Sequence, residues 1–349
     1  MERSGVGRYA VESTRALCRA RPEWSFALLS NRDLLAEGNA RSVRTRWPTD
    51  RAWGRVGWTH AGSRWDLRAD RFDCWIATAF ITPLWWRGRS VVTIHDLMFL
   101  EHRALYAGRV RALYATLATR RSAVRADAIV CGSAQTRQRL CERWGIEPRR
   151  IAVTPYGVSD VFSRDAGGAG ATGTRPFVLC VGTFEARKGL ATLHGAMAQL
   201  NAGRRVPVEL VLAGRPGWGA DAAVERLRRD PNVSFRIDPS DETLAELYRT
   251  AVATVYPSQA EGFGLPVAEA MASGCAVVSS DLACVREFAG DAAVYVPAGD
   301  AGALARALAR VVDDEQERRR LQDDGAARAA RLTWASVGSA IADRIEAVL

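Results

Sequence analysis

The sequence predicts an α/β protein with two halves, each built around a parallel β-sheet. Short apolar runs alternate with helical patterns along the 349 residues, which is typical of strands joined by crossover helices. The chain also exceeds the length at which a single hydrophobic core stops growing. Residues 160–174 include the run Gly167–Gly170 and have the composition of a linker. We therefore expect an N-terminal domain (1–160), a linker (161–174), a C-terminal domain (175–332) and a final helix (333–349).

Apolar runs bounded by turn residues mark the expected strands. In the first half they cover 24–30, 73–79, 90–95, 128–131 and 151–154. In the second half they cover 177–181, 208–213, 232–237, 252–256, 276–279 and 292–296. Apolar residues at helical spacing predict helices between or after them, notably over 110–125, 134–144, 301–312, 315–331 and 334–349.

Residues 256–281 form the most informative segment. An apolar run ends at Tyr256, the loop Gly262–Pro266 follows, and a helical pattern continues to Ser273. The two glycines of the loop allow backbone to approach a ligand closely, and proline suits the first turn of a helix. The start of that helix offers unpaired amides and a positive dipole end, which together favour an anion.

Two carboxylates flank this loop, Glu261 before it and Glu269 about two turns into the helix. Because carboxylates repel phosphate, their natural partners are sugar hydroxyls on either side of the anion. A diphosphate with a sugar at each end is a nucleotide sugar. The alternative is a surface glutamate and a helix glutamate around a structural glycine turn.

The segment EGFGLPVAEAMASG, with its glutamates eight positions apart, resembles the retaining glycosyltransferases of family 4. The resemblance implies the GT-B fold: two Rossmann-like domains that face a central cleft, with the last helix crossing back onto the N-terminal domain. It places Glu261 near the transferred sugar as a catalytic residue and Glu269 on the ribose. The loop amides of Phe263, Gly264 and Leu265 are then expected to bind the donor.

A second motif follows the apolar run at 175–181. The loop Gly182–Gly189 contains Lys188, the only lysine among 48 lysine and arginine residues. A compact ammonium suits phosphate where a guanidinium fork is bulkier. By resemblance, Arg187 and Lys188 bind the donor diphosphate, and Thr183 stands where many relatives have arginine. The form VGTFEARKG resembles the branch rich in mannosyltransferases, and a solvated basic turn is the alternative.

Two further candidates follow predicted strands. His95 ends the run at 90–94, at the edge where open α/β sheets bind ligands, and the resemblance makes it a catalytic residue close to the sugar. Taken alone, such a histidine is more often a satisfied core residue. Asp238 lies where relatives meet the nucleobase, but the sequence RIDPSDETL lacks their usual glycine turn. The base stays open, with a GDP-sugar slightly favoured over UDP- or dTDP-sugars.

The N-terminus matches a glycine loop that, in the family, follows the first strand and borders the donor phosphates. Gly5 and Gly7 are the candidate donor-binding residues there. Four residues before Gly5 leave no room for that strand, so we expect the first strand of the N-terminal sheet to be missing from this sequence. A flexible terminus is the alternative.

Composition argues against metal and disulfides. Seven scattered cysteines and four histidines show no metal-ligand spacing, so we expect reduced thiols, no metal and no cofactor other than the nucleotide sugar as co-substrate. No uncharged apolar span of 18 residues and no signal-peptide pattern occur. The expected location is cytoplasmic, with peripheral attachment to the inner face of the plasma membrane as an option.

Charge is uneven along the chain. Residues 1–165 carry 28 arginines against 16 acidic residues (+12), and residues 166–349 carry 20 basic against 23 acidic residues (−3). A basic acceptor-side half would attract an anionic membrane, a lipid-linked diphosphate or an acidic glycan. An arginine-rich surface without function is the alternative, and nothing resembles a nucleic-acid-binding motif.

The predicted function is a retaining glycosyltransferase (a hexosyltransferase). It would move a hexose-type sugar, with mannose as one option, from a nucleotide diphosphate sugar to a glycan or lipid-linked acceptor. A nucleotide-sugar 2-epimerase of the same fold and a catalytically silent nucleotide-sugar-binding protein are the alternatives.

Overall fold

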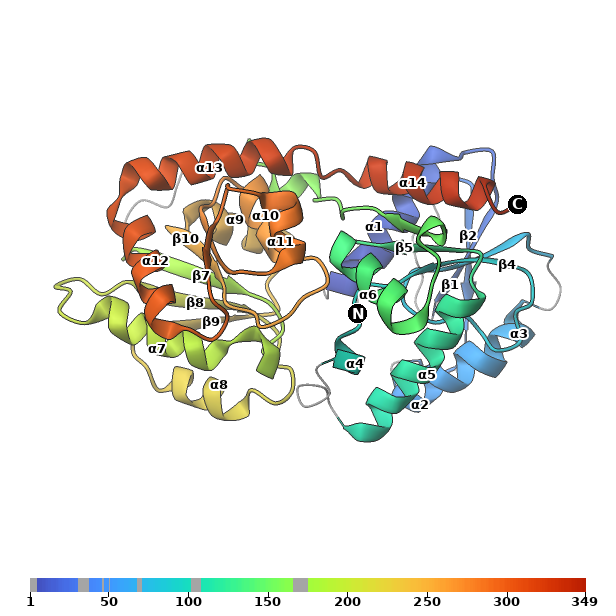
Figure 1. Cartoon of the computed structure of the whole chain (residues 1–349), viewed down its shortest axis with the longest axis horizontal. Helices are drawn as coiled ribbons and strands as arrows, with labels where there is room; N and C mark the ends of the chain where they lie inside the picture. The colour runs from blue at the N-terminus through green and yellow to red at the C-terminus, as the bar shows by residue number, and fades with distance from the viewer. Residues whose placement is uncertain are drawn as a thin grey trace. The chain divides into compact units, whose positions relative to one another are not determined.

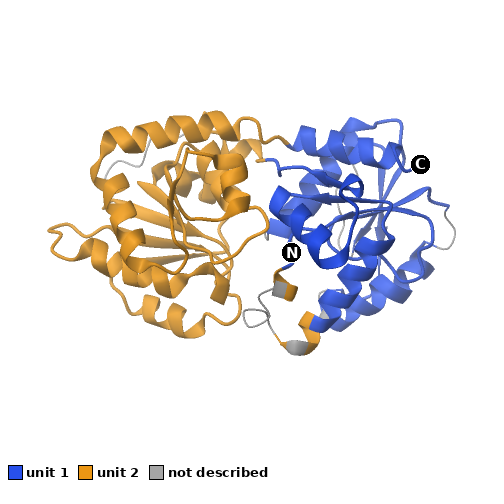
Figure 2. Cartoon of the chain, viewed as in Figure 1, with its two compact units in different colours: residues 1–97, 113–157, 334–349 blue, residues 98–112, 158–333 orange. Residues whose placement is uncertain are grey.

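The computed structural model describes residues 5–30, 38–45, 47–49, 51–67, 71–101, 108–165 and 175–349. The chain packs as two compact units, shown in blue and orange in Figure 2. Unit 1 comprises residues 1–97, 113–157 and 334–349, and unit 2 comprises residues 98–112 and 158–333. The last helix therefore belongs to the same unit as the first half of the chain.

Unit 1 contains a four-stranded parallel sheet in the order β3-β4-β5-β6. These strands are β3 (Cys74–Ala77), β4 (Arg89–Thr93), β5 (Ala128–Cys131) and β6 (Ile151–Val153). All of β5 and four of the five residues of β4 are buried, as expected for parallel strands covered on both faces. A separate parallel pair joins β1 (Phe26–Ser30) to β2 (Ala40–Arg44). The sequence did not predict β2, since ARSVR is too polar to form an apolar run.

The helices of the first part of the chain appear in Figure 1, and those within residues 98–112 belong to unit 2. They are α1 (Gly5–Ala20), α2 (Ala52–Gly57), a π-helical turn (Trp58–Gly62), α3 (Ser63–Asp66), α4 (Met98–Glu101), α5 (Arg109–Arg125) and α6 (Ala134–Trp144). Standard caps set the ends of α6: the Ser133 hydroxyl accepts from the amide of Thr136, and Gly145 adopts φ 66°. The expectation about the first strand of the N-terminal sheet concerns residues before Gly5, which lie outside the described part of the chain.

The C-terminal helix α14 (Trp334–Glu346) packs against α1 within unit 1. The two backbones approach closely at Gly338, where an added Cβ would lie 2.5 Å from the carbonyl carbon of Ala16. At the far end of α14, Arg21 pairs with Glu346 at 2.6 Å and with Asp343 at 3.3 Å. Glycine at position 338 is thus required by the packing of these helices.

Unit 2 contains a six-stranded parallel sheet in the order β12-β11-β10-β7-β8-β9. The strands are β7 (Phe177–Val181), β8 (Glu209–Gly214), β9 (Val233–Ile237), β10 (Ala253–Tyr256), β11 (Val277–Ser280) and β12 (Val294–Val296). The helices are α7 (Leu190–Asn201), α8 (Asp221–Arg228), α9 (Asp241–Thr250), α10 (Leu265–Ala272), α11 (Ala283–Ala289), α12 (Ala301–Asp313) and α13 (Glu315–Ala329). The prediction of two parallel α/β units is confirmed, and each predicted strand overlaps an observed one.

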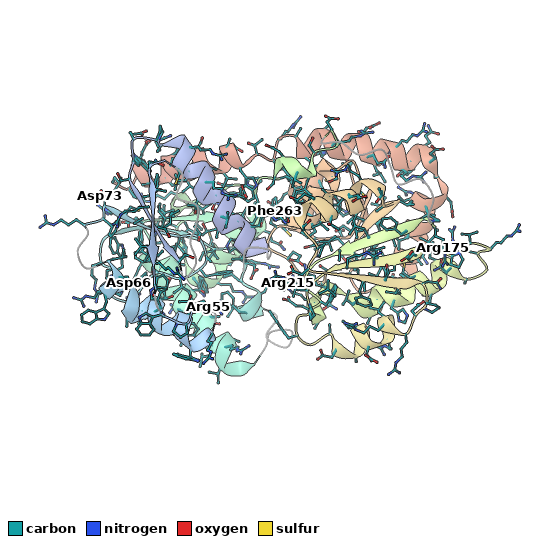
Figure 3. All side chains as sticks on the ribbon, turned by 180° about the vertical axis from the view of Figure 1, so that it is seen from behind. Arg55, Asp66, Asp73, Arg175, Arg215 and Phe263 are labelled. Carbon is teal, nitrogen blue, oxygen red and sulfur yellow. The ribbon has the colours of Figure 1, made fainter. Side chains whose placement is uncertain are left out.

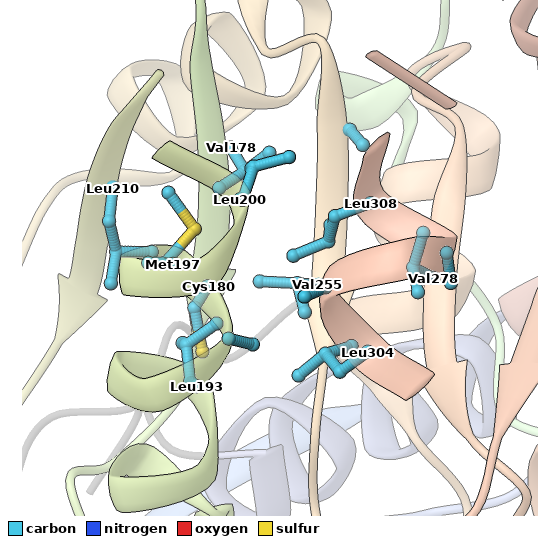
Figure 4. Packing of buried hydrophobic residues seen from close by; sticks show 14 of the residues in the cluster. Val178, Cys180, Leu193, Met197, Leu200, Leu210, Val255, Val278, Leu304 and Leu308 are labelled. Carbon is cyan, nitrogen blue, oxygen red and sulfur yellow. The ribbon is translucent and has the colours of Figure 1, made fainter. Parts of the chain in front are cut away.

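The core of unit 2 lies between its sheet and the helices α7 and α12. Figure 4 shows Val178, Leu210 and Val255 of the sheet facing Leu193 of α7 and Leu304 of α12. Alternate strand positions and one face of each helix thus supply the same core. This packing fixes the ends of β7 and β10, where the predicted motifs lie.

The stretch predicted as a linker begins inside unit 2. Asp160–Phe162 form a 3₁₀ turn, and Phe162 is fully buried against Tyr248. The carbonyl of Phe162 accepts from the Ser273 hydroxyl at 2.9 Å. These contacts fix the start of the stretch, while residues 166–174 lie outside the described residues.

Candidate functional site

The sheet of unit 2 reverses its order between β7 and β10. From β7, the first strand of the unit, β8 and β9 continue on one side, and β10, β11 and β12 lie on the other. Open α/β sheets bind ligands beyond the carboxyl ends of strands at such a reversal. The loops that leave β7 and β10 at this edge are 182–189 and 257–264, the two loops that carry the predicted motifs.

Glycines bring these two loops into contact. Gly189 has φ 66°, and a Cβ there would lie 2.1 Å from the carbonyl oxygen of Pro257, so glycine is required on both grounds. The amide of Gln259 donates to the carbonyl of Arg187 at 2.8 Å. The two motifs therefore form one structure, although some seventy residues separate them.

A buried ion-pair cluster joins the loops. Lys188 Nζ lies 2.6 Å from Glu261 Oε1, and Arg187 Nη1 pairs with the same oxygen. Lys188 is buried, and the side chain of Glu261 is largely buried as well. The structure thus brings together three of the predicted site residues, and the two cations share one carboxylate oxygen.

Tyr256 also contacts Lys188. The Tyr256 hydroxyl lies 3.3 Å from Lys188 Nζ, and its ring centroid lies 4.9 Å from that nitrogen, which adds a cation–π contact. Across the lysine stem, a Cβ at Gly182 would meet Lys188 Cε at 3.3 Å. Tyr256 was not among the predicted site residues; its one signal in the sequence is that it ends the apolar run before the glycine loop.

The burial and the charges of the cluster shift the pKa values of Glu261 and Lys188. Burial alone raises the pKa of Glu261, but the charges of Arg187 and Lys188 outweigh burial and hold the pKa at about 2. Burial lowers the pKa of Lys188, and Glu261 opposes that shift. Glu261 is therefore a carboxylate at neutral pH.

A second carboxylate completes the cluster. Arg187 Nε donates to Glu185 Oε2 at 2.9 Å, and Glu185 is itself buried. Two cations and two carboxylates give these four side chains no net charge. An anion that binds here therefore meets basic groups that already pair with Glu261 and Glu185. Sequence reasoning missed Glu185, whose signal is its place two residues before Arg187.

Glu269 occupies a different environment. It lies inside α10 and is buried, and Tyr248 donates its hydroxyl to Glu269 Oε2 at 3.2 Å. The two glutamates of the motif therefore have different partners: Glu261 contacts the basic pair, and Glu269 contacts a buried tyrosine. Tyr248 on α9 was not predicted as part of the site.

The glycine loop ends at the start of α10. Gly264 has φ 108°, a value that favours glycine, and α10 begins at Leu265 with Pro266 in its first turn. Phe263 is buried and stacks on Phe288 with ring centroids 4.7 Å apart. The loop thus places the Leu265 amide at the carboxyl edge of the sheet, whereas Pro266 has no N–H and the Val267 amide donates to the Gly264 carbonyl at 2.9 Å.

Asp238 and Thr183 lie at the same edge of unit 2. Asp238 has φ 50° and forms a two-point ion pair with Arg215, with distances of 2.7 and 3.0 Å. The carbonyl of Thr183 accepts from the amide of Glu185 at 2.9 Å. In Figure 3, Arg215 and Phe263 lie at one end of the unit 2 sheet and Arg175 at the other.

His95 is enclosed in unit 1 by aromatic rings. Nε2 lies 3.0 Å from the Thr78 carbonyl, and Nδ1 lies 2.6 Å from the Tyr156 hydroxyl. Because a carbonyl can only accept, Nε2 carries the proton and Nδ1 accepts from Tyr156. Burial lowers the pKa of His95 to about 4, so the ring is neutral at pH 7. The rings of Tyr9 and Phe80 each pack against the His95 ring in a T-shaped arrangement, with centroids 4.9 and 5.1 Å away.

Gly5 and Gly7 lie in the first turn of α1. A Cβ added at Gly5 would have no heavy atom within 4 Å, whereas Gly7 is buried. Tyr9, two residues later, is fully buried and pairs with Thr93 Oγ1 at 3.1 Å. The start of α1 is thus packed beside His95 through Tyr9.

Within the described residues, no group of three or more His, Cys, Asp or Glu side chains is placed to hold a metal ion. In the same residues, no helix is both long and apolar enough to cross a membrane.

Two family models match the chain. Residues 3–161 match the model described as Glycosyltransferase Family 4, and residues 164–328 match the model described as Glycosyl transferases group 1. The chain belongs to glycosyltransferase family 4.

Relatives of this family 4 chain include two mannosyltransferases. The O-antigen chain mannosyltransferase B of Escherichia coli is 34% identical over 161 residues, which are 45% of this chain and 42% of that protein. The MMP alpha-(1->4)-mannosyltransferase of Mycolicibacterium hassiacum is 31% identical over 201 residues, 56% of this chain and 48% of that protein. The chain thus matches less than half the length of either relative.

Solved structures of similar fold extend over the whole family 4 chain. WaaG, a glycosyltransferase involved in lipopolysaccharide biosynthesis, has a TM-score of 0.80 at 17% identity and covers 98% of this chain and 96% of its own. Alr3699/HepE from Anabaena, in complex with UDP and glucose, has a TM-score of 0.72 at 16% identity, with coverage of 98% and 96%. The predicted GT-B fold, with parallel sheets in two Rossmann-like domains, is confirmed.

Proposed function

We propose that this protein is a retaining glycosyltransferase that transfers a hexose from a nucleotide diphosphate sugar to a glycan or lipid-linked acceptor. The observation that supports this best is the buried cluster of Arg187, Lys188 and Glu261 beyond the carboxyl ends of β7 and β10. Two cations in loops at the carboxyl edge of a parallel sheet suit a diphosphate. The membership in family 4 supports the reaction class.

In this proposal, Arg187 and Lys188 bind the diphosphate and stabilise the negative charge that grows on it as the sugar leaves. Lys188 Nζ has three protons to donate, and its described partners are Tyr256 and Glu261. A phosphate oxygen therefore takes a remaining position or replaces Glu261. Once displaced, the Glu261 carboxylate is available to the transferred sugar and its developing positive charge.

The remaining predicted residues receive separate roles. Glu269 accepts hydrogen bonds from the ribose, Asp238 and Thr183 border the nucleotide, and the amides of Phe263–Leu265 face the phosphates. His95 lies near the sugar as a neutral ring, because its pKa of about 4 leaves it uncharged at pH 7. Gly5 and Gly7 border the phosphates.

Mannose is the proposed sugar and a GDP-sugar the first donor to test. The two relatives described above are both mannosyltransferases by name. A UDP-sugar is the second choice, since the Anabaena protein of similar fold was crystallised with UDP. We propose that no metal ion takes part, because the basic pair and the helix amides supply the positive charge at the phosphates.

We also propose that the protein works on the cytoplasmic side of an anionic membrane. The +12 charge of residues 1–165 would attract a negatively charged surface or a lipid-linked diphosphate. A soluble acidic glycan is the other acceptor class that this charge favours.

The test is an incubation of the purified protein with GDP-mannose, UDP-glucose and dTDP-sugars, each with and without bacterial lipid extract. Mass spectrometry follows the acceptor, and proton NMR follows the anomeric configuration of the product. We expect acceptor-dependent release of nucleotide diphosphate and an α-linked product from an α-linked donor. Release of nucleotide with free sugar and no glycosylated product would instead indicate the 2-epimerase, and binding without turnover would indicate a silent binding protein.

A further inference from the structure

Helix α5 exposes an apolar stripe. Leu113, Leu117 and Val124 are spaced to share one face of the helix, and Leu113 and Leu117 are 59% and 58% exposed. Arg120 lies on the same face between Leu117 and Val124. A neighbouring face of the helix, at Ala112, Thr119 and Ala123, is buried. Large apolar side chains in a row on the outer face of a helix mark an interaction site.

Two neighbouring segments extend this surface. Tyr114 of α5 hydrogen-bonds to His60 at 2.9 Å, which joins α5 to the helical segment 52–66. Arg121 of α5 donates to the carbonyl of Leu84 at 3.1 Å, which joins α5 to the turn at 83–86. Trp85 of that turn donates to Ser63 at 3.0 Å. The three segments are thus in mutual contact within unit 1, and α2, α3 and α5 lie together in Figure 1.

These segments also expose large apolar side chains. Trp53 and Trp65 are 63% and 66% exposed, and Leu84 is exposed as well. Tryptophan has an apolar body with one polar group and is enriched where proteins meet the boundary between lipid and water. We define the α5 surface by six apolar residues and four exposed arginines. They are Trp53, Trp65, Leu84, Leu113, Leu117 and Val124, with Arg64, Arg87, Arg120 and Arg125.

The charge on this surface is mainly positive. Helix α5 has five arginines and no acidic residue. Arg64, Arg87, Arg120 and Arg125 are exposed, and no ion pair is described for them in the part of the chain that the structure covers. Asp66 is the acidic residue of α3, and it accepts from Trp58 at 2.7 Å. Exposed arginines beside an apolar stripe suit a partner with an apolar interior and a negatively charged surface.

We propose that the α5 surface docks unit 1 onto an anionic lipid bilayer, with the leucines and tryptophans entering the interface and the arginines binding lipid phosphates. Apolar burial and phosphate attraction add in such a contact. A surface of arginines alone would fit a soluble polyanion as well, whereas the apolar stripe favours lipid. The proposal deepens the membrane location given under the proposed function, and it names the face that meets the lipid.

The test is sedimentation of the full chain with vesicles of phosphatidylglycerol and phosphatidylcholine, compared with phosphatidylcholine alone. We expect binding to the anionic vesicles that weakens as salt is raised. Leu113→Ser/Leu117→Ser should lower the partition coefficient by about tenfold or more. Arg64→Gln/Arg120→Gln/Arg125→Gln should lower it by about a hundredfold, since each arginine contributes a factor of about five near an anionic surface.

Matched controls separate this surface from general charge and hydrophobicity. Val206→Ser/Leu349→Ser removes two apolar side chains of similar exposure elsewhere, and Arg205→Gln/Arg226→Gln/Arg306→Gln removes three exposed arginines of unit 2. Both controls should bind vesicles as the wild type does. Equal losses in control and test variants, or equal binding to neutral vesicles, would overturn the proposal.

Two other partners are outcomes of the same experiment. Binding to soluble polyglutamate in place of vesicles would assign the surface to an acidic macromolecule and overturn the lipid proposal. A dimer that Leu113→Ser/Leu117→Ser dissociates, without vesicle binding, would assign it to a second copy of the chain. Vesicle binding needs no turnover, and nucleotide binding is measured separately by thermal shift, so failure of the lipid proposal is distinguishable from failure of the proposed function.

Discussion

Lys188 Nζ and Glu261 Oε1 lie 2.6 Å apart inside unit 2, although 73 positions separate the two residues in the sequence. Arg187 pairs with the same carboxylate oxygen. The groups proposed to bind phosphate are thus both paired with the carboxylate proposed to face the sugar. Donor binding then exchanges one partner of the basic pair for another, which links the phosphate site to the position of Glu261.

Lys188→Ala should weaken binding of the nucleotide diphosphate by about ten- to a hundredfold, because a hydrogen bond to a charged group contributes about 1.5–3 kcal/mol. Lys188→Arg should retain more affinity, since it keeps the charge, but not all of it, because Gly182 and Tyr256 closely confine the lysine stem. Isothermal titration calorimetry measures both. Arg306→Ala, which removes an exposed cation on α12, should have no effect. Unchanged affinity in Lys188→Ala would refute the phosphate assignment.

The two glutamates of the motif should respond differently to the same substitution. Glu269→Gln should weaken both free nucleotide diphosphate and nucleotide sugar, because its carboxylate is assigned to the ribose. Glu261→Gln should leave nucleotide diphosphate affinity unchanged or higher, since it removes a competitor for Arg187 and Lys188. Its loss should be in kcat, where a carboxylate beside a developing positive charge matters most.

Calorimetry with the nucleotide diphosphate and turnover assays of both variants decide this point. Glutamine keeps the shape of glutamate, so the comparison isolates charge. Equal losses of nucleotide affinity in the two variants would show that the roles are assigned wrongly. Tyr248→Phe serves as a further check, because it removes the hydroxyl that donates to Glu269 and leaves Glu261 untouched.

Sequence patterns predicted the sheet of unit 2 well because buried parallel strands are continuous apolar runs. Phe177–Val181 and the Leu210–Ala213 part of β8 are of this kind. The polar strand Ala40–Arg44 was missed for the opposite reason. Loop glycines and the lone lysine identified the cluster residues Arg187, Lys188 and Glu261. Their shared oxygen was not predictable, because it depends on how two distant loops pack at Gly189 and Pro257.

The tyrosines around the site also escaped prediction. Tyr256, Tyr248 and Tyr156 each hydrogen-bond to a predicted residue, but in the sequence they look like ordinary core positions. The sequence predicted His95 as a residue close to the sugar but gave no hydrogen-bond partners for it. The structure shows a neutral ring with a partner on each nitrogen. A hydrogen-bonded partner across the fold leaves no periodic pattern in the chain, so it emerges only with the structure.

Activity should persist in EDTA. In the proposed mechanism Arg187, Lys188 and the amides of Phe263–Leu265 supply the positive charge at the diphosphate, so a divalent ion is not needed there. Turnover is measured before and after chelation, and again after Mg²⁺ or Mn²⁺ is added back. Strict dependence that either ion restores would contradict the phosphate site described above. Nucleotide affinity measured in EDTA provides the control for an indirect effect on folding.

His95 should make the stability of unit 1 depend on pH in a defined window. Burial depresses the pKa of His95 from 6.5 to about 4, so between these values the unfolded chain binds a proton that the folded chain does not. Its stabilising contribution is therefore complete above about pH 6.5 and is lost as pH falls toward 4. Glu261, whose pKa is lowered from 4.5 to about 2, contributes stability above 4.5 and loses it only at lower pH, so the two windows are distinct.

The wild type should thus lose roughly 2 kcal/mol more unfolding free energy between pH 7 and pH 5 than His95→Gln. Urea unfolding followed by tryptophan fluorescence reports on unit 1, because all eleven tryptophans except Trp218 belong to it. His194→Gln, in unit 2, should show the pH dependence of the wild type. Glutamine can still donate to the Thr78 carbonyl and accept from Tyr156, so the variant removes the titration while keeping the hydrogen bonds. Identical pH dependence in wild type and His95→Gln would show that the buried ring is not the group that titrates.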